Sequence, residues 1–106
     1  MTDDRRRAEG ELTELRHSID NLDAAMLHIL AERFRCTHAI GQLKARYRME
    51  ARDPEREAVQ LGRLQLLAAQ SGLDPEFARK FHALVVREVI GNHEAVRGKL
   101  GPDNEP

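Results

Sequence analysis

The sequence is poor in aromatic residues and in cysteine. Phe, Tyr and Trp together make up 4% of its 106 residues, and Cys36 is the one cysteine. A single thiol excludes an internal disulfide and is typical of proteins of the reducing cytosol. Leu, Ala, Glu and Arg dominate the composition, and runs of β-branched residues are nearly absent. We therefore predict an all-helical protein.

The sequence also lacks a large net charge of either sign, and it lacks a long apolar run. The formal net charge is -1, so the chain has no overall basic surface for nucleic acid. No apolar run reaches the length of a membrane span, and residues 1–7 lack the apolar segment of a signal peptide. We expect a cytoplasmic protein of one domain that binds neither nucleic acid nor a membrane.

A heptad repeat runs through residues 11–46, a stretch without proline and, before Gly41, without glycine. The apolar residues of this heptad seam form two series: Leu12, Ile19, Met26 and Ile40 in one, and Leu15, Leu22, Ile29, Cys36 and Leu43 in the other. The seam predicts a helix of about 54 Å that packs along its whole length. A compact chain of this size has a radius of gyration of about 13 Å, too small to cover that helix. We therefore predict an obligate dimer with antiparallel long helices.

Two shorter helices are expected after the long one. Asp53-Pro54-Glu55 and Asp74-Pro75-Glu76 each combine an N-cap residue, a proline at the first helical position and an acid in the first turn. They predict helices over about 54–70 and 75–97. The expected organisation is a disordered N-terminal extension over 1–10, a helical domain over 11–97 and a flexible C-terminal tail over 98–106.

Arg33 occupies a seam position where an apolar residue belongs. A buried guanidinium is costly unless an anion meets it. Lys44 follows three helical turns later, on the same face and about 16 Å along the axis, so both cations could converge on one small molecule. Arg16 lies about 25 Å from Arg33 on the same helix, but in an antiparallel dimer it would be level with position 41 of the other chain. Three such cations suit a small ligand with two carboxylates.

Further polar candidates lie on the two shorter helices. Glu88 and Asn92 fall on the apolar stripe of the last helix, which indicates a pocket wall. Asp53, Arg56 and Glu57 cluster at the start of the middle helix. Asp53 and Glu57 are one turn apart, so they could accept a hydrogen bond from a ligand hydroxyl.

The combined spacing resembles the all-helical (AroQ-type) chorismate mutases over about residues 11–97. The matching residues are Leu15-Arg16, Ile19-Asp20, Leu22-Asp23, Leu30-Ala31-Glu32-Arg33, Ile40-Gly41, Lys44 and Arg52-Asp53-Pro54-Glu55-Arg56-Glu57. The resemblance implies an intertwined homodimer of three-helix chains. It also implies an isomerase of phenylalanine and tyrosine biosynthesis, which converts chorismate into prephenate by an intramolecular Claisen rearrangement.

The resemblance also implies a role for each candidate residue. Arg33 and the partner subunit's Arg16 would bind the two carboxylates of the substrate, and Lys44 would donate to the ether oxygen. The remaining candidates would hold the ring hydroxyl, support the pocket or supply an amide donor from the last helix: Asp53, Glu57, Arg56, Glu88 and Asn92. A pericyclic reaction needs a substrate held in a reactive shape and positive charge at the ether oxygen. We therefore expect no cofactor and no metal.

The register of the last helix stays open at this point. Glu88 and Asn92 align with positions where relatives often have serine and glutamine, and a shift of one residue would put Val89 and His93 there instead. A glutamate beside a dianionic substrate would have to pair with a cation or be protonated.

Other functions are compatible with the same residues. Isochorismate-pyruvate lyase shares the fold and the cationic pocket, and a non-catalytic helical module could dimerise or bind a metabolite. Taken singly, Arg33 could extend to solvent or pair with a glutamate, and Lys44 could be an ordinary solvated residue. Stand-alone relatives can be activated by the first synthase of the shikimate pathway, which makes such a synthase a candidate partner.

Overall fold

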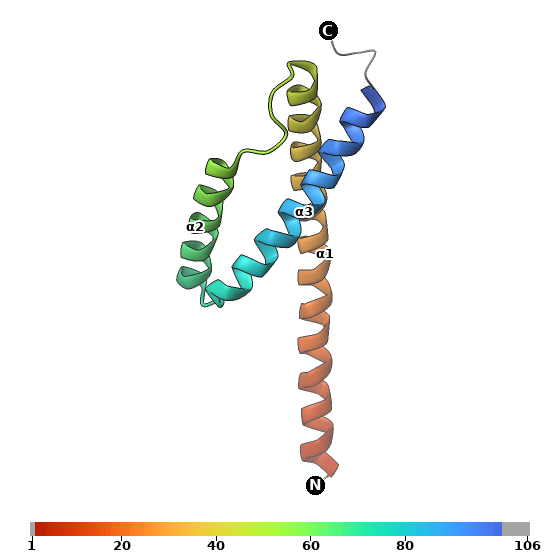
Figure 1. Cartoon of the computed structure of the whole chain (residues 1–106). Helices are drawn as coiled ribbons and strands as arrows, with labels where there is room; N and C mark the ends of the chain where they lie inside the picture. Colours follow the sequence, from red (N-terminus) through yellow and green to blue (C-terminus); the bar gives the residue numbers. More distant parts are fainter. Residues whose placement is uncertain (1, 101–106) are drawn as a thin grey trace. The chain divides into compact units, whose positions relative to one another are not determined.

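The computed structural model describes residues 2–100, which form three α-helices (Figure 1). The helices are α1 (Thr2–Arg46), α2 (Pro54–Ser71) and α3 (Pro75–Leu100), and the described residues contain no strand. The all-helical fold predicted from the sequence is confirmed. The expected tail over 98–106 falls mainly on residues 101–106, which lie outside the described residues.

The first turn of α1 begins at Thr2, earlier than the start expected near Glu11. Asp3 and Asp4 stand in this turn, where carboxylates complement the positive end of the helix dipole. One turn later, Arg5 Nε donates to Glu9 Oε1 at 3.3 Å. These local pairs favour helix without any apolar contact, which is why a search for the heptad pattern places the start too late.

The chain divides into two units, Met1–Arg35 and Cys36–Pro106. The first unit is the N-terminal part of α1, and most of its apolar seam is exposed: Leu15 is 63%, Leu22 67% and Ile29 68% exposed. Contiguous apolar surface of this kind marks an interaction site in soluble proteins.

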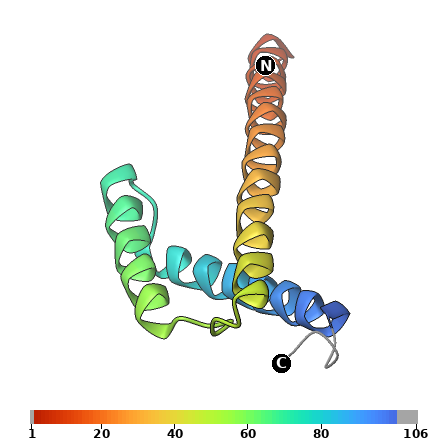
Figure 2. The same ribbon diagram turned by 90° about the horizontal axis from the view of Figure 1, so that it is seen from above.

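The second unit contains the end of α1 together with α2 and α3. Here α2 and α3 pack against each other and are joined by a short turn (Figures 1 and 2). The buried apolar residues of this packing are small: Ala68, Ala78 and Val85. Two histidines of α3, His82 and His93, are buried as well. The ring of His93 lies against Gly41 of α1, where an added Cβ atom would be 2.9 Å from its Nε2.

The ends of α1 and α2 have the same hydrogen-bond pattern. After α2, Leu73 N donates to Ala68 O at 2.8 Å, and Gly72 adopts a φ of 79°. After α1, Met49 N donates to Lys44 O at 2.8 Å, and Arg48 takes the left-handed position with a φ of 54°. Both are Schellman ends, which normally place glycine at the left-handed residue.

No helix within residues 2–100 has the length and apolar character needed to cross a membrane.

Candidate functional site

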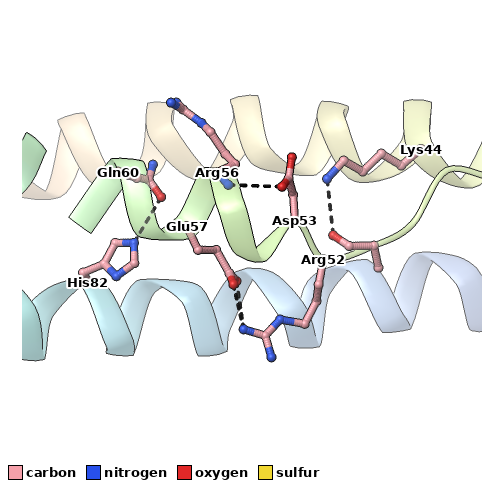
Figure 3. A network of polar contacts seen from close by, with 8 residues as sticks. Lys44, Arg52, Asp53, Arg56, Glu57, Gln60 and His82 are labelled. Carbon is pink, nitrogen blue, oxygen red and sulfur yellow. Dashed lines mark hydrogen bonds and ion pairs between the residues drawn. The ribbon is translucent and has the colours of Figure 1, made fainter. Parts of the chain in front are cut away.

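Lys44 lies in the last turn of α1 and is half-buried. Its Nζ donates to the carbonyl oxygen of Ala51 at 3.3 Å (Figure 3), and its own carbonyl accepts from Met49 N. Main chain and side chain of Lys44 therefore bind two points of the loop that leads to α2, Met49 and Ala51. This places the ammonium group beside the start of α2.

An open cleft of about 490 Å³ surrounds this ammonium group. The cleft is lined by Lys44, Met49, Glu50, Arg52, Asp53, Pro54 and Glu55. Its volume lies within the range of small-molecule sites. The structure thus brings together two of the residues predicted for the site, Lys44 and Asp53.

Asp53 caps α2, as its position before Pro54 predicts. Its Oδ1 accepts a hydrogen bond from Arg56 N at 3.1 Å (Figure 3), and its carbonyl accepts from Glu57 N at 3.0 Å. The side chains of Asp53 and Arg56 are both exposed. Capping uses one carboxylate oxygen and leaves the carboxylate at the wall of the cleft, so capping and ligand binding are compatible.

Glu57 is held by a cation that the sequence did not single out. Arg52 Nη2 donates to Glu57 Oε1 at 3.0 Å and to Oε2 at 2.8 Å, and the Glu57 side chain is 22% exposed (Figure 3). Arg52 precedes the helix by two residues, so no helical spacing links it to Glu57. Its place beside Asp53, within the stretch that resembles the family, was the available signal.

A second cleft of about 340 Å³ lies on the other side of this ion pair, between the start of α2 and the middle of α3. It is lined by Arg52, Glu57, His82, Ala83, Val86, Arg87 and Ile90. The Nε2 atom of His82 lies 3.2 Å from Oε1 of Gln60 on α2 (Figure 3). Arg52 and Glu57 therefore connect the Lys44 cleft to the face of α3.

The other two cations of α1 that the sequence predicts for the site, Arg16 and Arg33, lie in the first unit. Arg16 is exposed, whereas Arg33 is half-buried. The Nη1 atom of Arg33 is buried and has no hydrogen-bond partner among the described residues. A buried guanidinium N–H without an acceptor is costly, as the seam pattern suggested for this residue. The convergence of Arg16, Arg33 and Lys44 on one ligand stays a prediction.

The candidates on α3 differ in burial. Glu88 is exposed and Asn92 is half-buried, while Val89 is half-buried and His93 is buried. His93 contacts the end of α1, where its Nε2 lies 3.0 Å from the carbonyl oxygen of Thr37. His93 thus faces α1, and which residues of α3 face a ligand stays a prediction.

The described chain is an all-helical protein that gathers charged side chains at the end of its first helix and the start of its second. It belongs to the chorismate mutase type II family, which matches residues 15–94. The match includes all the candidate site residues named from the sequence.

Three relatives from bacteria are similar in sequence to this chain over part of their length. The chain is 37% identical over 79 residues to the T-protein of Enterobacter agglomerans, which covers 74% of this chain and 21% of the T-protein. It is 41% identical over 88 residues to the bifunctional chorismate mutase/prephenate dehydratase of Neisseria gonorrhoeae, covering 80% of this chain and 22% of that protein. A bifunctional protein of the same name from Buchnera aphidicola (subspecies Schizaphis graminum) is 25% identical over 97 residues, covering 92% and 25%. The chain thus spans about a quarter or less of the length of these relatives.

Proposed function

We propose that this chain catalyses the rearrangement of chorismate to prephenate. The observation that carries the proposal is the half-buried ammonium group of Lys44, at the wall of a metabolite-sized cleft, in a chain of the chorismate mutase type II family. The proposed catalytic domain over 11–97 encloses the segment matched by the family, 15–94.

Lys44 is the proposed donor to the ether oxygen whose C–O bond breaks. Negative charge grows on this oxygen in the transition state, and a fixed cation stabilises it more strongly in a site that excludes water. The ammonium group donates to a neutral carbonyl at 3.3 Å, which is long for a hydrogen bond. Exchange of this contact for a developing oxyanion is favourable because the attraction between opposite charges adds to the hydrogen bond.

The other candidates would bind and orient the substrate. Arg33 has a buried N–H group that needs an anionic acceptor, so we assign it to one carboxylate. The partner subunit's Arg16 would bind the other carboxylate. Asp53 and Glu57 would hold the hydroxyl, with Arg52 fixing the carboxylate of Glu57 through two contacts. Arg56 would support the pocket, and Asn92 would supply an amide donor from α3 beside Lys44. Glu88, exposed on α3, would act at the rim of the pocket.

We further propose that the working form is an intertwined homodimer. The exposed heptad seam supports it, since Leu15, Leu22 and Ile29 are each more than half exposed in one chain. A second antiparallel copy has a matching seam by symmetry, so the same residues cover each other. In the dimer, the Arg16 of each subunit would reach the site of the other subunit, which lacks an Arg16 from its own chain.

An activating synthase of the shikimate pathway remains a proposed partner. The relatives from Neisseria and Buchnera are each named for two activities. In those proteins a chorismate mutase and a second enzyme share one polypeptide. Addition of such a synthase to the assay would raise kcat/KM if the proposal holds.

The experiment is a spectroscopic assay of chorismate loss with prephenate identified as the product. We expect turnover by the wild type and a fall of about 10²–10³-fold for Lys44→Ala, the size of effect seen when an electrostatic donor is removed. Lys80→Ala, at an exposed lysine of α3, is the matched control and should keep wild-type turnover.

The same assay run on isochorismate tests the lyase. Release of pyruvate from isochorismate, without prephenate from chorismate, would replace the proposed reaction. A folded wild type that turns over neither substrate, alone or with the synthase, would leave the non-catalytic module as the function.

A further inference from the structure

The ring hydroxyl of the proposed substrate has two side-chain acceptors assigned to it and no side-chain donor. Asp53 and Glu57 are carboxylates, and an ionised carboxylate only accepts hydrogen bonds. A hydroxyl group has one proton and two lone pairs, so it can donate to one of them while its oxygen still needs a donor. A complete hydroxyl site therefore requires an N–H or O–H group close to these two carboxylates.

Gln60 is the next polar residue on the face of α2 that carries both carboxylates. Asp53, Glu57 and Gln60 follow at spacings of four and three residues, which puts them on one stripe of the helix. Glu57 and Gln60 are both half-buried. The two arginines of this region, Arg52 and Arg56, are exposed. Gln60 is thus the side-chain donor that shares the half-buried surface of Glu57.

His82 of α3 orients the amide group of Gln60. His82 is 7% exposed, and its Nε2 lies 3.2 Å from Oε1 of Gln60 (Figure 3). An amide oxygen accepts hydrogen bonds, so Nε2 of His82 is the donor in this contact. The two N–H groups of Gln60 then lie on the side of the amide that faces away from His82, where they can donate to a ligand.

The carboxylate of Glu57 can take part in the same hydroxyl site. Glu57 and His82 both line the cleft of about 340 Å³ between α2 and α3, so Gln60 is bound to the wall of the cleft that contains Glu57. Arg52 donates once to each oxygen of Glu57. A carboxylate has about four lone-pair sites, so these two contacts leave room for a hydrogen bond from a ligand hydroxyl.

We propose that Gln60 binds the substrate directly, as the N–H donor to the oxygen of the ring hydroxyl whose proton is donated to Glu57. The inference rests on the proposed function, because the hydroxyl belongs to the proposed substrate. Its consequence is specificity, since a ligand without this hydroxyl leaves both the donor and the acceptor without a partner. The hydroxyl takes no part in the bond changes, so its binding affects KM more than kcat.

The first test combines a substitution in the protein with a change in the substrate. Gln60→Met keeps the length of the side chain and removes the amide. We expect it to lower kcat/KM for chorismate about three- to tenfold, mainly through KM, the size of one hydrogen bond. For a chorismate analogue that lacks the ring hydroxyl, the same substitution should change kcat/KM less than about twofold.

Gln65→Met, at another half-buried glutamine of α2, is the matched control and should keep the wild-type kcat/KM for both compounds. The comparison of the two compounds separates contact from support of the fold. If Gln60 only supported the packing of α2 on α3, Gln60→Met would lower kcat/KM for both compounds alike. That result, or wild-type kinetics in Gln60→Met, would overturn the proposal.

The contact is also tested without turnover and without a substitution. The rearrangement leaves the ring hydroxyl in place, so prephenate serves as an equilibrium ligand. In proton–nitrogen-15 NMR spectra of the wild type, prephenate should shift the side-chain amide signals of Gln60 and leave those of Gln65 unchanged. Unshifted Gln60 signals at high prephenate concentration would overturn the proposal. Shifted Gln60 signals in a wild type that does not turn over chorismate would contradict the proposed function and leave the Gln60 contact standing.

Discussion

Arg52 shows how much of the site depends on one unpredicted side chain. It touches both clefts and holds the two carboxylate oxygens of Glu57. Without it, an unpaired carboxylate would face the proposed substrate, chorismate, which carries two negative charges. Like charges at close range repel most strongly where water is partly excluded.

Replacement of Arg52 by alanine should therefore weaken substrate binding. We expect KM of Arg52→Ala for chorismate to rise about tenfold, which corresponds to about 1.4 kcal/mol, the size typical of one partly buried charged hydrogen bond. Arg79→Ala is the matched control, since it removes an exposed pair with Glu76 on α3 and should leave KM unchanged. Steady-state kinetics on the three proteins measure this effect, and equal KM values for both variants would contradict it.

Glu76 is the carboxylate whose titration the structure perturbs. The hydrogen bond from Arg79, followed by the attraction of its charge, lowers the pKa of Glu76 below its usual value of 4.5, and Lys80 contributes in the same direction. A carboxyl group with a lower pKa in the folded state stabilises the fold above its unfolded pKa, and this contribution is lost as pH falls.

The pair should therefore appear in the pH dependence of stability. We expect the wild type to lose part of its stability as pH falls below about 4.5 through the lower pKa of folded Glu76, and Glu76→Gln to lack this part of the loss. Because both side chains are about half exposed, the difference should be small and weaken in high salt. Thermal unfolding at several pH values tests this, and parallel curves for the two proteins would refute it.

At the scale of the helices, the ends of α1 and α2 offer a comparison within one chain. Both end in the same hydrogen-bond pattern, but the left-handed residue is Gly72 in one and Arg48 in the other. The left-handed conformation costs a side-chain-bearing residue about 1–2 kcal/mol. Glycine avoids this cost but loses more entropy on folding, by about 0.4–1 kcal/mol.

We expect Arg48→Gly to stabilise the protein by about 0.5–1 kcal/mol, the difference between these two terms. Gly72→Ala should destabilise it by a similar amount, because it introduces the strain that Arg48 already has. Denaturant unfolding with a common m-value measures both. A loss of stability in Arg48→Gly would mean that its side chain makes contacts worth more than the strain.

The helix starts were predictable, whereas one helix end was not. Asp53 and Asp74 act through atoms only two or three residues away, so the Asp-Pro-Glu pattern located α2 and α3 correctly. The end of α1 lacks glycine at its left-handed residue, so the sequence pointed only to a connection there. The contact of His93 with Gly41 joins residues far apart in the chain, and such pairs leave no local pattern.

At the scale of the whole molecule, the exposed heptad seam leads to a sharp test of subunit exchange. Arg16→Ala and Lys44→Ala should each lose activity as homodimers. If Arg16 acts across the interface, a mixed dimer of the two variants contains one site with both residues intact. Random pairing makes about half of the dimers mixed, so an equal mixture should recover about a quarter of wild-type activity.

This recovery is measured after joint denaturation and refolding of the two variants. Each variant refolded alone is the control, as is a mixture of Lys44→Ala with wild type. No recovery in the mixture of variants would place Arg16 in the site of its own chain, and full activity of Arg16→Ala alone would remove it from the site. A folded monomer in sedimentation would contradict the dimer directly.

The sequence predicted only part of the set of residues that form the candidate site. The heptad spacing put Lys44 on the face of Arg33, and the Asp-Pro-Glu pattern put Asp53 at a helix start; both residues line one cleft in the structure. The choice between Asn92 and His93 could not be made from the sequence, because they are neighbours on one helix and the spacing of α3 does not show which of the two faces α1. In the structure His93 is buried and contacts Thr37, while the choice between the two as site residues stays a prediction.

The close approach of His93 to Gly41 has a consequence for how this sequence can change over generations. Gly41 cannot be exchanged freely while His93 stays, because any side chain at 41 meets the ring. Among related chains the residues at positions 41 and 93 should therefore covary. A larger residue at 41 should accompany a smaller one at 93. A substitution at 93 that removes the ring would make room for a side chain at 41. The reverse order, with a side chain added at 41 first, would be disfavoured because it meets the ring.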